Sequence, residues 1–353
     1  MSYASLPGFS DLILPQLLQA YGFSEQTAAI TSFGSGLINH TWKVTTPEGD
    51  FILQRINHAV FKEPEAIAFN LELIGEYLEQ THPDYLFTRP MTSTDGSNLI
   101  YLPEGGYFRL FAFVAGSHSI DVVQTADQAY EAAKQFGRFT RLLTGLDASR
   151  LRTTIPDFHN ITLRFEQFQD ALKNGNPERI KESAALTRRL LSHTDIVDTY
   201  NRICSSPAFS IRVTHHDTKI SNVLFDQQDK GLCVIDLDTV MPGYFISDVG
   251  DMMRTYLSPV SEEEKDFSKI EVRDDMFTAI VNGYSEEMRD HLSEEERGQF
   301  FYAGCFLIYM QALRFLTSYL NNDAYYGSAY PGQNRVRTEN QLVLLERLLE
   351  KRK

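Results

Sequence analysis

The stretch that decides the fold of this 353-residue chain runs from Val213 to Thr239, VTHHDTKISNVLFDQQDKGLCVIDLDT. Two short apolar runs, VLF and CVI, flank a polar segment with a glycine, and this pattern predicts a β-hairpin. Asn222 and Asp236 stand just outside the two runs, each seven residues from Asp229 (229 − 222 and 236 − 229). Pairing of the runs would make the two side chains cross-strand neighbours that bind one cation together.

Upstream of the hairpin, Asp217 lies two residues after His215 and five before Asn222. A carboxylate followed by an amide and a second carboxylate is typical of a phosphoryl-transfer site. One Asp orients and deprotonates the attacking hydroxyl, while Asn and Asp hold Mg²⁺ on the triphosphate of ATP. The kinase signature H-x-D-x-x-x-x-N followed by a metal-binding Asp is matched, although DLD at 236–238 replaces the DFG of protein kinases. The alternative interpretation is an acidic surface hairpin without chemistry.

On these motifs, and on IDLDTVMPG at 235–243, the chain resembles the aminoglycoside-phosphotransferase and choline-kinase superfamily of small-molecule kinases. It is most similar to the N-acetylhexosamine 1-kinases, over most of residues 31–345. The resemblance implies an α+β, bilobal protein-kinase-like fold, with a small β-sheet N-lobe at 1–113 and a mostly helical C-lobe at 114–353. Asp217 is then the catalytic base. Lys219, in the same loop, is close enough to neutralise charge on the transferring phosphoryl group.

The composition excludes several other classes of protein. With 33 basic and 47 acidic residues the net charge is −14, the opposite of a general nucleic-acid binder, so we expect no nucleic-acid partner. The negative charge of the chain repels ATP, so Mg²⁺ and basic residues must compensate this charge locally at an ATP site. Three scattered cysteines form no zinc or disulfide pattern and fit a cytoplasmic protein. The longest apolar run, Phe300–Met310, has 11 residues, which predicts a buried helix and no membrane span. We expect a monomer or a weak homodimer.

The N-terminal third contains candidate phosphate-binding residues. Residues 30–44 predict a strand, a glycine turn and a second strand, and Gly34 and Gly36 would let the backbone approach a phosphate closely. A plain hairpin turn is the alternative for these two glycines. A third strand, 51–56, carries Arg55 where kinases place the lysine that holds the α- and β-phosphates. A solvent-facing arginine on an edge strand is the alternative.

A helix predicted over 64–80 follows, and it resembles the kinase helix that positions the phosphate-binding basic residue. Glu65 and Glu72 are both candidate partners for Arg55, and the sequence does not choose between them. Further strands are predicted at 85–91 and 98–102.

The apolar segment FRLFAFVAG at 108–116 ends the predicted N-lobe. In the kinases that the chain resembles, this segment is the hinge between the lobes, and its backbone binds adenine. Ala112 and Val114 occupy the matching positions.

Helical spacing dominates the rest of the chain. Asp248-Val249-Gly250-Asp251 opens a helix, and its carboxylates either form a second metal site or cap the helix and brace the catalytic loop, which we favour. A capping box at Ser293 starts a helix that runs to about Leu320, and another at Thr338 opens the last helix. The other predicted helices span 126–146, 161–173 and 177–204.

The acceptor side of the site is predicted from residues 312–326, where Arg314 stands among apolar residues and Tyr325 follows. A charge on so apolar a helix is costly unless it is paired or lies in a pocket. Together with His40 and Asp238, these residues offer hydrogen-bonding groups for sugar hydroxyls and an aromatic face for the ring. Alternatively, Arg314 ties its helix to an acidic neighbour. His159 receives no chemical role.

These observations predict an enzyme that transfers the γ-phosphate of ATP to the anomeric hydroxyl of an N-acetylhexosamine, with Mg²⁺ as cofactor. Kinases of another small alcohol or hexose, such as choline, homoserine or an aminoglycoside, are the first alternative. An inactive nucleotide-binding regulator is the second. The presence of the base and both metal ligands argues against the regulator.

Overall fold

The computed structural model describes residues 13–34 and 38–352, and it divides into two compact units. The sheet unit consists of the described residues up to Ser117 together with Leu146–Pro156 and Cys233–Met241; the helical unit consists of His118–Gly145, Asp157–Leu232 and the described residues from Pro242. The α+β class is confirmed. A single boundary at residue 113 does not describe this division, because the first segment runs to Ser117 and two later segments return to the sheet unit.

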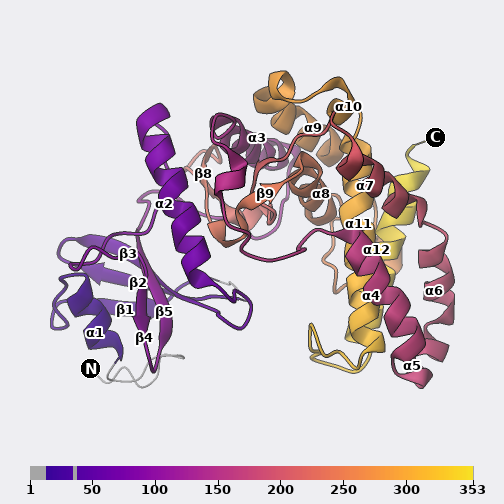
Figure 1. Cartoon of the computed structure of the whole chain (residues 1–353), viewed down its shortest axis with the longest axis horizontal. Helices are drawn as coiled ribbons and strands as arrows, with labels where there is room; N and C mark the ends of the chain where they lie inside the picture. The colour runs from indigo at the N-terminus through magenta and orange to yellow at the C-terminus, as the bar shows by residue number, and fades with distance from the viewer. Residues whose placement is uncertain (1–12, 35–37, 353) are drawn as a thin grey trace. The chain divides into compact units, whose positions relative to one another are not determined.

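The sheet unit is built on an antiparallel sheet that has five strands in the described residues, in the order β1-β2-β3-β5-β4 (Figure 1). Its strands are β1 (Ala29–Ser32), β2 (His40–Thr46), β3 (Gly49–Ile56), β4 (Ile100–Leu102) and β5 (Gly106–Ala112). Alternate residues of β2 and β3 are buried, as period-two strands with one covered face require. Helix α1 (Ile13–Ala20) packs its leucines against Trp42 and the neighbouring core side chains.

The strand expected at 85–91 does not form, and the one expected at 98–102 shortens to β4. Pro90 has no N–H to donate to a ladder, and proline is tolerated only at the edges of sheets. Met91 makes a backbone hydrogen bond to Leu110 of β5 (2.7 Å), so the segment follows the sheet without joining it.

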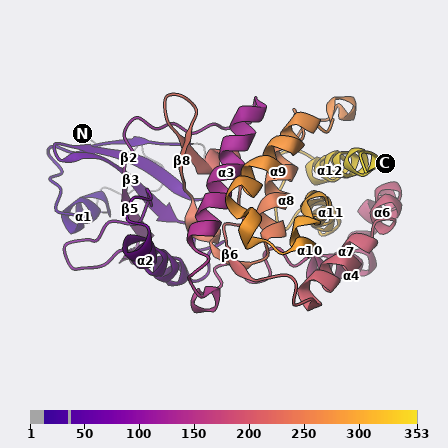
Figure 2. The same ribbon diagram turned by 90° about the horizontal axis from the view of Figure 1, so that it is seen from above.

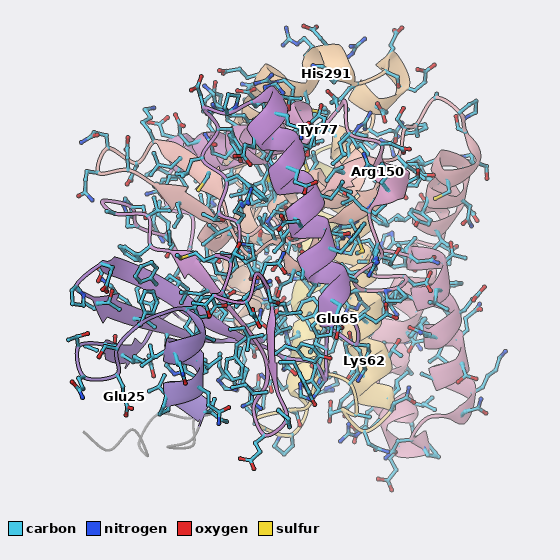
Figure 3. All side chains as sticks on the ribbon, turned by 60° about the vertical axis from the view of Figure 1, so that its left-hand side comes forward. Glu25, Lys62, Glu65, Tyr77, Arg150 and His291 are labelled. Carbon is cyan, nitrogen blue, oxygen red and sulfur yellow. The ribbon has the colours of Figure 1, made fainter. Side chains whose placement is uncertain are left out.

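Helix α2 (Pro64–Thr81) starts on Pro64, as predicted, and Figure 3 shows Glu65 and Tyr77 towards its opposite ends. Its buried Asn70 explains why later segments belong to the sheet unit. The side-chain amide donates to the Arg152 carbonyl (2.8 Å) and the Val240 carbonyl (3.0 Å), and its oxygen accepts from the Arg152 N–H (2.8 Å). One amide thus holds both returning segments against α2.

The helical unit is organised around α11 (Phe300–Leu320), which is mostly buried (Figures 1 and 2). The helices that contact it most are α4 (Ile161–Asn174), α7 (Asp195–Ser205), α8 (Phe245–Tyr256) and α12 (Gln333–Glu350). By length and composition α11 is apolar enough to cross a membrane, but its burial makes it the core helix that the sequence predicts. Helix α3 (Ala126–Leu142) packs on α9 (Asp274–Met288), where a Cβ on Gly283 would collide with the Tyr130 carbonyl.

Two predicted helices are broken in the structure. The segment 177–204 forms α5 (Pro177–Glu182), α6 (Ala184–Leu191) and α7, with breaks at Ser183 and at the polar turn 192–194. The capping box at Ser293 is confirmed, but it opens only α10 (Glu294–Arg297), which ends at Gly298 before α11 begins. Ser, Thr and Gly favour turn conformations over helix interiors, and here that local preference decides.

Candidate active site

The loop that carries Asp217 is held by a carboxylate of α8. One oxygen of Asp248 accepts the His215 N–H (3.0 Å), and the other accepts the His216 N–H (2.7 Å). Asp248 is fully buried, and burial raises its pKa to about 7 against the opposing effect of the two N–H donors. The bracing role that we favoured for the carboxylates of α8 is confirmed for Asp248.

The second carboxylate of α8 holds the other side of the same loop. Asp251 accepts the Thr218 N–H (2.8 Å), while the Thr218 hydroxyl donates to the backbone carbonyl of Asp248 (2.7 Å). The hydroxyl of buried Tyr256 donates to the Thr218 carbonyl (2.7 Å). Arg254 pairs with Asp251 (2.9 Å) and compensates its charge. The residues on both sides of Asp217 are therefore fixed by hydrogen bonds from α8.

Strained backbone accompanies this loop. His216 has φ +66°, an unusual value for a residue with a side chain, and such strain often accumulates at functional sites. Its ring lies against Gly243 of β9 (Met241–Gly243), where an added Cβ would collide with the imidazole and with the Thr214 hydroxyl. Glycine at 243 is thus required for the loop to adopt this conformation.

The carboxylate of Asp217 is 21% exposed, and one of its oxygens is already occupied. Oδ2 accepts from the Asn222 amide (3.1 Å) and lies 3.1 Å from Lys219 Nζ. Among the described residues no group donates to Oδ1. The carboxylate is thus fixed through one oxygen, and the other can accept a proton from a substrate hydroxyl.

The predicted hairpin is present as β7 (Val223–Phe225) and β8 (Gly231–Val234), with Asp229 at φ +56° in its turn. Helix α3 supports it through Gln135, whose amide donates to the Gly231 carbonyl (2.8 Å). At its start, the Asn222 amide also donates to the Asp217 carbonyl (2.8 Å), which fixes the side chain. In the described structure Asn222 Oδ1 accepts no hydrogen bond, so it suits a hard cation that prefers oxygen ligands.

Asp236 follows β8 and belongs to the sheet unit. It has the left-handed conformation, φ 58° and ψ 58°, and its side chain is exposed. Left-handed backbone is costly for residues other than glycine, and Asn and Asp tolerate it best among them. The exposed carboxylate offers oxygen atoms of the kind Mg²⁺ prefers, and its role as a metal ligand stays a prediction.

Asp238, two residues further on, has a different environment. It is 1% exposed, forms an ion pair with buried Arg109, and accepts from the Asn39 amide (2.7 Å). Arg109 also donates twice to the Gln54 side chain (3.1 and 2.8 Å). We expected Asp238 to bind the acceptor, but its carboxylate is buried and engaged by protein groups. These contacts give it a structural role inside the sheet unit.

The predicted phosphate-binding residues are partly described. Gly34 has φ +77° and open space around it, whereas Gly36 lies outside the described residues. Arg55 lies half-buried on β3 and pairs with neither candidate carboxylate. Glu72 accepts from Asn98 (2.8 Å) and Glu65 is hydrogen-bonded to Tyr107, so the described residues leave the Arg55 guanidinium without an acidic partner.

The hinge residues lie at the end of β5. Ala112 pairs with Phe51 in the sheet, and the next N–H, that of Phe113, donates to Asp50 (3.0 Å). The Val114 carbonyl accepts from Ser117, while its N–H has no partner among the described residues. One backbone donor therefore remains for a ligand at this position.

A cleft of about 550 Å³ lies in the helical unit, between α4 and the end of α11. Its lining residues are mostly polar: Arg164, Glu166, Gln167, Asp170, Arg314, Thr317, Ser318, Asn321, Ala324 and Tyr325. Arg314 donates to Gln311 (3.2 Å) and to the hydroxyl of exposed Tyr325 (3.1 Å). Within the described residues it pairs with no carboxylate, so it does not tie α11 to an acidic neighbour. His40, the other predicted acceptor residue, is exposed on β2 and stacks on Trp42.

A ring stack lies beside this cleft. Phe158 stacks on buried His159 (4.5 Å between centroids), and His159 lies 5.3 Å from the ring of His216. The Arg314 guanidinium lies 5.8 Å from the centre of the Phe158 ring. Burial, with His216 and Arg314 nearby, holds the pKa of His159 well below its usual value. The neutral imidazole of His159 thus packs between the cleft and the catalytic loop.

The model of the phosphotransferase enzyme family (APH) matches residues 29–268, most of the chain. This protein belongs to that family. The match covers the sheet, the Asp217 loop, the hairpin and the braces on α8. It does not identify the acceptor.

Solved structures confirm the fold of this phosphotransferase. A microcompartment-associated aminopropanol kinase is 19% identical and superposes with a TM-score of 0.64, covering 96% of this chain and 97% of that one. An amicoumacin kinase, solved with AMP-PNP, Ca²⁺ and Ami, is 18% identical, with a TM-score of 0.61 and coverage of 94% and 93%. An aminoglycoside phosphotransferase from Alicyclobacillus acidocaldarius is 12% identical, with a TM-score of 0.63 and 97% coverage of both chains.

Sequence reasoning about this phosphotransferase missed Asn70, Arg109 and Arg164. Asn70 and Arg109 act inside the sheet unit through partners far along the chain. Arg164 follows the predicted start of a helix and has the spacing of an ordinary solvated helix face. The one hint in the sequence that Arg164 belongs to a site is its position shortly after Phe158 and His159, in a segment to which no role is assigned.

Proposed function

We propose that this phosphotransferase transfers the γ-phosphate of ATP to the anomeric hydroxyl of an N-acetylhexosamine. The observation that carries the proposal is the state of Asp217, which is held through Oδ2 by Asn222 and Lys219 while Oδ1 is open. Family membership supports the reaction class. Nucleotide use is supported by the solved structure of the amicoumacin kinase, whose name includes AMP-PNP.

In the proposed reaction Asp217 Oδ1 accepts the proton of the acceptor hydroxyl. The hydroxyl oxygen forms a bond to the γ-phosphorus, and the bond from that phosphorus to the bridging oxygen of ADP breaks. Lys219, 3.1 Å from the Asp217 carboxylate, neutralises charge on the transferring group. Asn222 and Asp236 would hold Mg²⁺, which supplies charge neutralisation for the triphosphate. Both offer oxygen atoms of the kind this ion prefers.

The remaining nucleotide contacts are assigned by position in the sheet unit. Gly34 and Gly36 would approach the phosphates, and Arg55 would bind them through its two-pronged guanidinium. The backbone at Ala112 and Val114 would bind adenine, for which the Val114 N–H is a free donor among the described residues.

On the acceptor side we propose Arg314, Tyr325 and His40 as binding residues, and no longer Asp238. A cationic acceptor such as choline would meet the two guanidiniums of Arg164 and Arg314 in the same cleft, which disfavours that alternative. We further propose that the enzyme acts in the cytoplasm as a monomer or weak homodimer. Its three unpaired cysteines fit a reducing compartment.

The test of this function is Asp217→Asn, which keeps the shape of the side chain and removes proton acceptance. We expect turnover to fall by about 10²- to 10⁴-fold while Mg·ATP affinity stays within a few-fold. ADP release over a panel of sugars, with the product identified as a sugar 1-phosphate by phosphorus NMR, gives the readout. Asp198→Asn, an exposed change on α7, is the control. Turnover of Asp217→Asn within tenfold of the parent would refute the assignment of the base.

We expect substitutions at the two proposed metal ligands to reduce turnover by different amounts. Asp236→Ala should reduce turnover more than Asn222→Ala, because a carboxylate contributes charge as well as a lone pair to a hard cation. High Mg²⁺ should partly restore Asn222→Ala. Rates measured across a Mg²⁺ titration check this, and two variants with rates independent of Mg²⁺ would exclude shared binding.

A further inference from the structure

The cleft between α4 and α11 contains two guanidiniums that form no ion pair with a carboxylate of the described residues. Arg164 donates to the Gln167 side chain (3.0 Å) and to the backbone carbonyl of Asp157 (2.8 Å). Arg314 donates to the neutral side chains of Gln311 and Tyr325. Neither arginine forms an ion pair anywhere in the described parts of the chain, although both are half-buried.

Arg164 also has an unused donor. Its Nε is buried and has no hydrogen-bond partner among the described residues. A buried donor without a partner is rare, because it loses its hydrogen bond to water and gains nothing in return. The two guanidiniums line the same cleft, and burial and the nearby charge of Arg314 lower the pKa of Arg164 more than Tyr325, Tyr326 and Asp157 raise it. The arrangement is therefore costly as long as the cleft holds no anion.

The acidic side chains around the cleft do not remove this cost. The Asp157 carboxylate accepts from Asn160 (3.0 Å); Arg164 hydrogen-bonds only to the backbone carbonyl of that residue, and the carboxylate acts on it without direct contact. Glu166 and Asp170 line the cleft but are exposed, and Asp170 accepts from Asn174 (2.6 Å). Because the chain carries a net charge of −14, an acidic ligand is repelled at long range and needs a local basic pair such as this one.

We propose that Arg164 and Arg314 together bind a carboxylate carried by the acceptor, so that the preferred acceptor is an acidic sugar, such as an N-acetylhexosamine that also carries an acid group. The proposal rests on the function proposed above and specifies its substrate class. Two planar guanidinium forks match the two oxygens of a carboxylate, and a neutral sugar would leave both charges uncompensated. Arg314 then contributes charge as well as a hydrogen bond, and Arg164 is an additional residue that determines specificity.

The experiment compares sugars that differ only in the acid group: glucose with glucuronic acid, galactose with galacturonic acid, and N-acetylglucosamine with N-acetylglucosaminuronic acid. Binding is measured by calorimetry with saturating ADP and Mg²⁺, so that the nucleotide site is filled and no turnover is required. We expect at least one acid to bind about ten- to a hundredfold more tightly than its neutral partner, the usual value of a charged hydrogen bond.

The variants separate recognition from scaffolding. In Arg164→Gln the ratio of acid to neutral affinity should fall about tenfold, and Arg164→Lys should restore it only in part because an ammonium lacks the planar fork. In the double variant, Arg164→Gln with Arg314→Gln, the ratio of acid to neutral affinity should fall by less than the product of the two single-variant decreases, since one carboxylate contacts both residues. Arg188→Gln, an equal change of charge on the exposed face of α6, should leave the ratio unchanged.

Each result decides the question. The proposal would be overturned if the acidic and the neutral sugar bind equally, or if neither binds. It would also be overturned if Arg164→Gln reduces the affinity for both sugars by the same factor. Phosphorylation of neutral N-acetylhexosamines without acid preference would leave the proposed function intact and remove only this inference. Selective binding of an acidic sugar without phosphate transfer to any sugar would support this inference and refute the proposed function.

Discussion

Two parts of the molecule place arginines in protected positions, and they treat the charge in opposite ways. In the sheet unit Arg109 is buried and neutralised by Asp238, and Gln54 accepts from its Nε and Nη2. In the helical unit Arg164 and Arg314 lie in a cleft with neutral partners only, as far as the described residues show. A paired buried charge serves the fold, whereas an unpaired one is kept at a cost in stability and indicates a ligand.

The largest effect is expected where the charge is paired. Arg109→Met leaves the Asp238 carboxylate buried without its cation, and it should lower the free energy of unfolding by about 3–5 kcal/mol. Arg109→Met combined with Asp238→Leu removes both charges and should recover most of that loss. Urea unfolding curves of the single and double variants test the pair. If Arg109→Met is as stable as the parent, the ion pair between Arg109 and Asp238 does not contribute to stability.

An intermediate effect is expected at His159, which stays neutral beside the cleft cations. Its pKa is lowered in the folded protein, so below the ordinary value of 6.5 the unfolded chain takes up a proton that the folded chain does not. Stability contributed by the neutral ring is therefore present above pH 6.5 and lost as the pH falls, by at most about 1.4 kcal/mol per pH unit. His159→Gln should lack this dependence in unfolding experiments between pH 7 and 5, whereas His291→Gln, on the surface, should retain it. Identical slopes for the parent and His159→Gln would exclude the prediction.

The smallest effect is expected where the charge is unpaired. Arg164→Met loses two hydrogen bonds but also relieves repulsion from Arg314, so the free energy of unfolding should change by less than about 1 kcal/mol. The difference from the parent should depend on salt, because screening weakens the repulsion between the two cations. Unfolding at 20 mM and 500 mM NaCl measures this. A loss as large as that of Arg109→Met would mean that Arg164 is a scaffold residue and would remove the contrast between the two units.

Local signals account for the parts of the fold that the sequence predicts. The hairpin around Asp229, the strand that carries Arg55 and the helix that starts at Pro64 each depend on neighbouring residues, and all three form where expected. Breaks within long helical patterns were missed because the turn preference of Ser183 and Gly298 is weak beside the helical spacing of the surrounding residues, although it decides the local structure.

Contacts between distant residues account for what the sequence does not show. Asp238 has the chemistry of a site residue, and only the folded sheet brings Arg109, 129 positions earlier (238 − 109), onto it. Arg164 likewise has an ordinary helical spacing, and its place in the cleft becomes visible only when the fold brings Arg314, from a helix far along the chain, into the same lining. The braces from Asp248 and Asp251 were predictable from the paired carboxylates of the DVGD segment, although neither caps α8, which begins at Phe245 without a side-chain cap.

The chain has one tryptophan, Trp42, and it lies 2% exposed in the core of the sheet unit against α1. Its fluorescence therefore reports on that unit, while the circular dichroism of the helices is dominated by the other. A denaturation experiment that follows both signals would show whether the two units melt in one cooperative transition or in succession. The same indole provides a spectroscopic probe of the β-sheet during each turnover, without any added label.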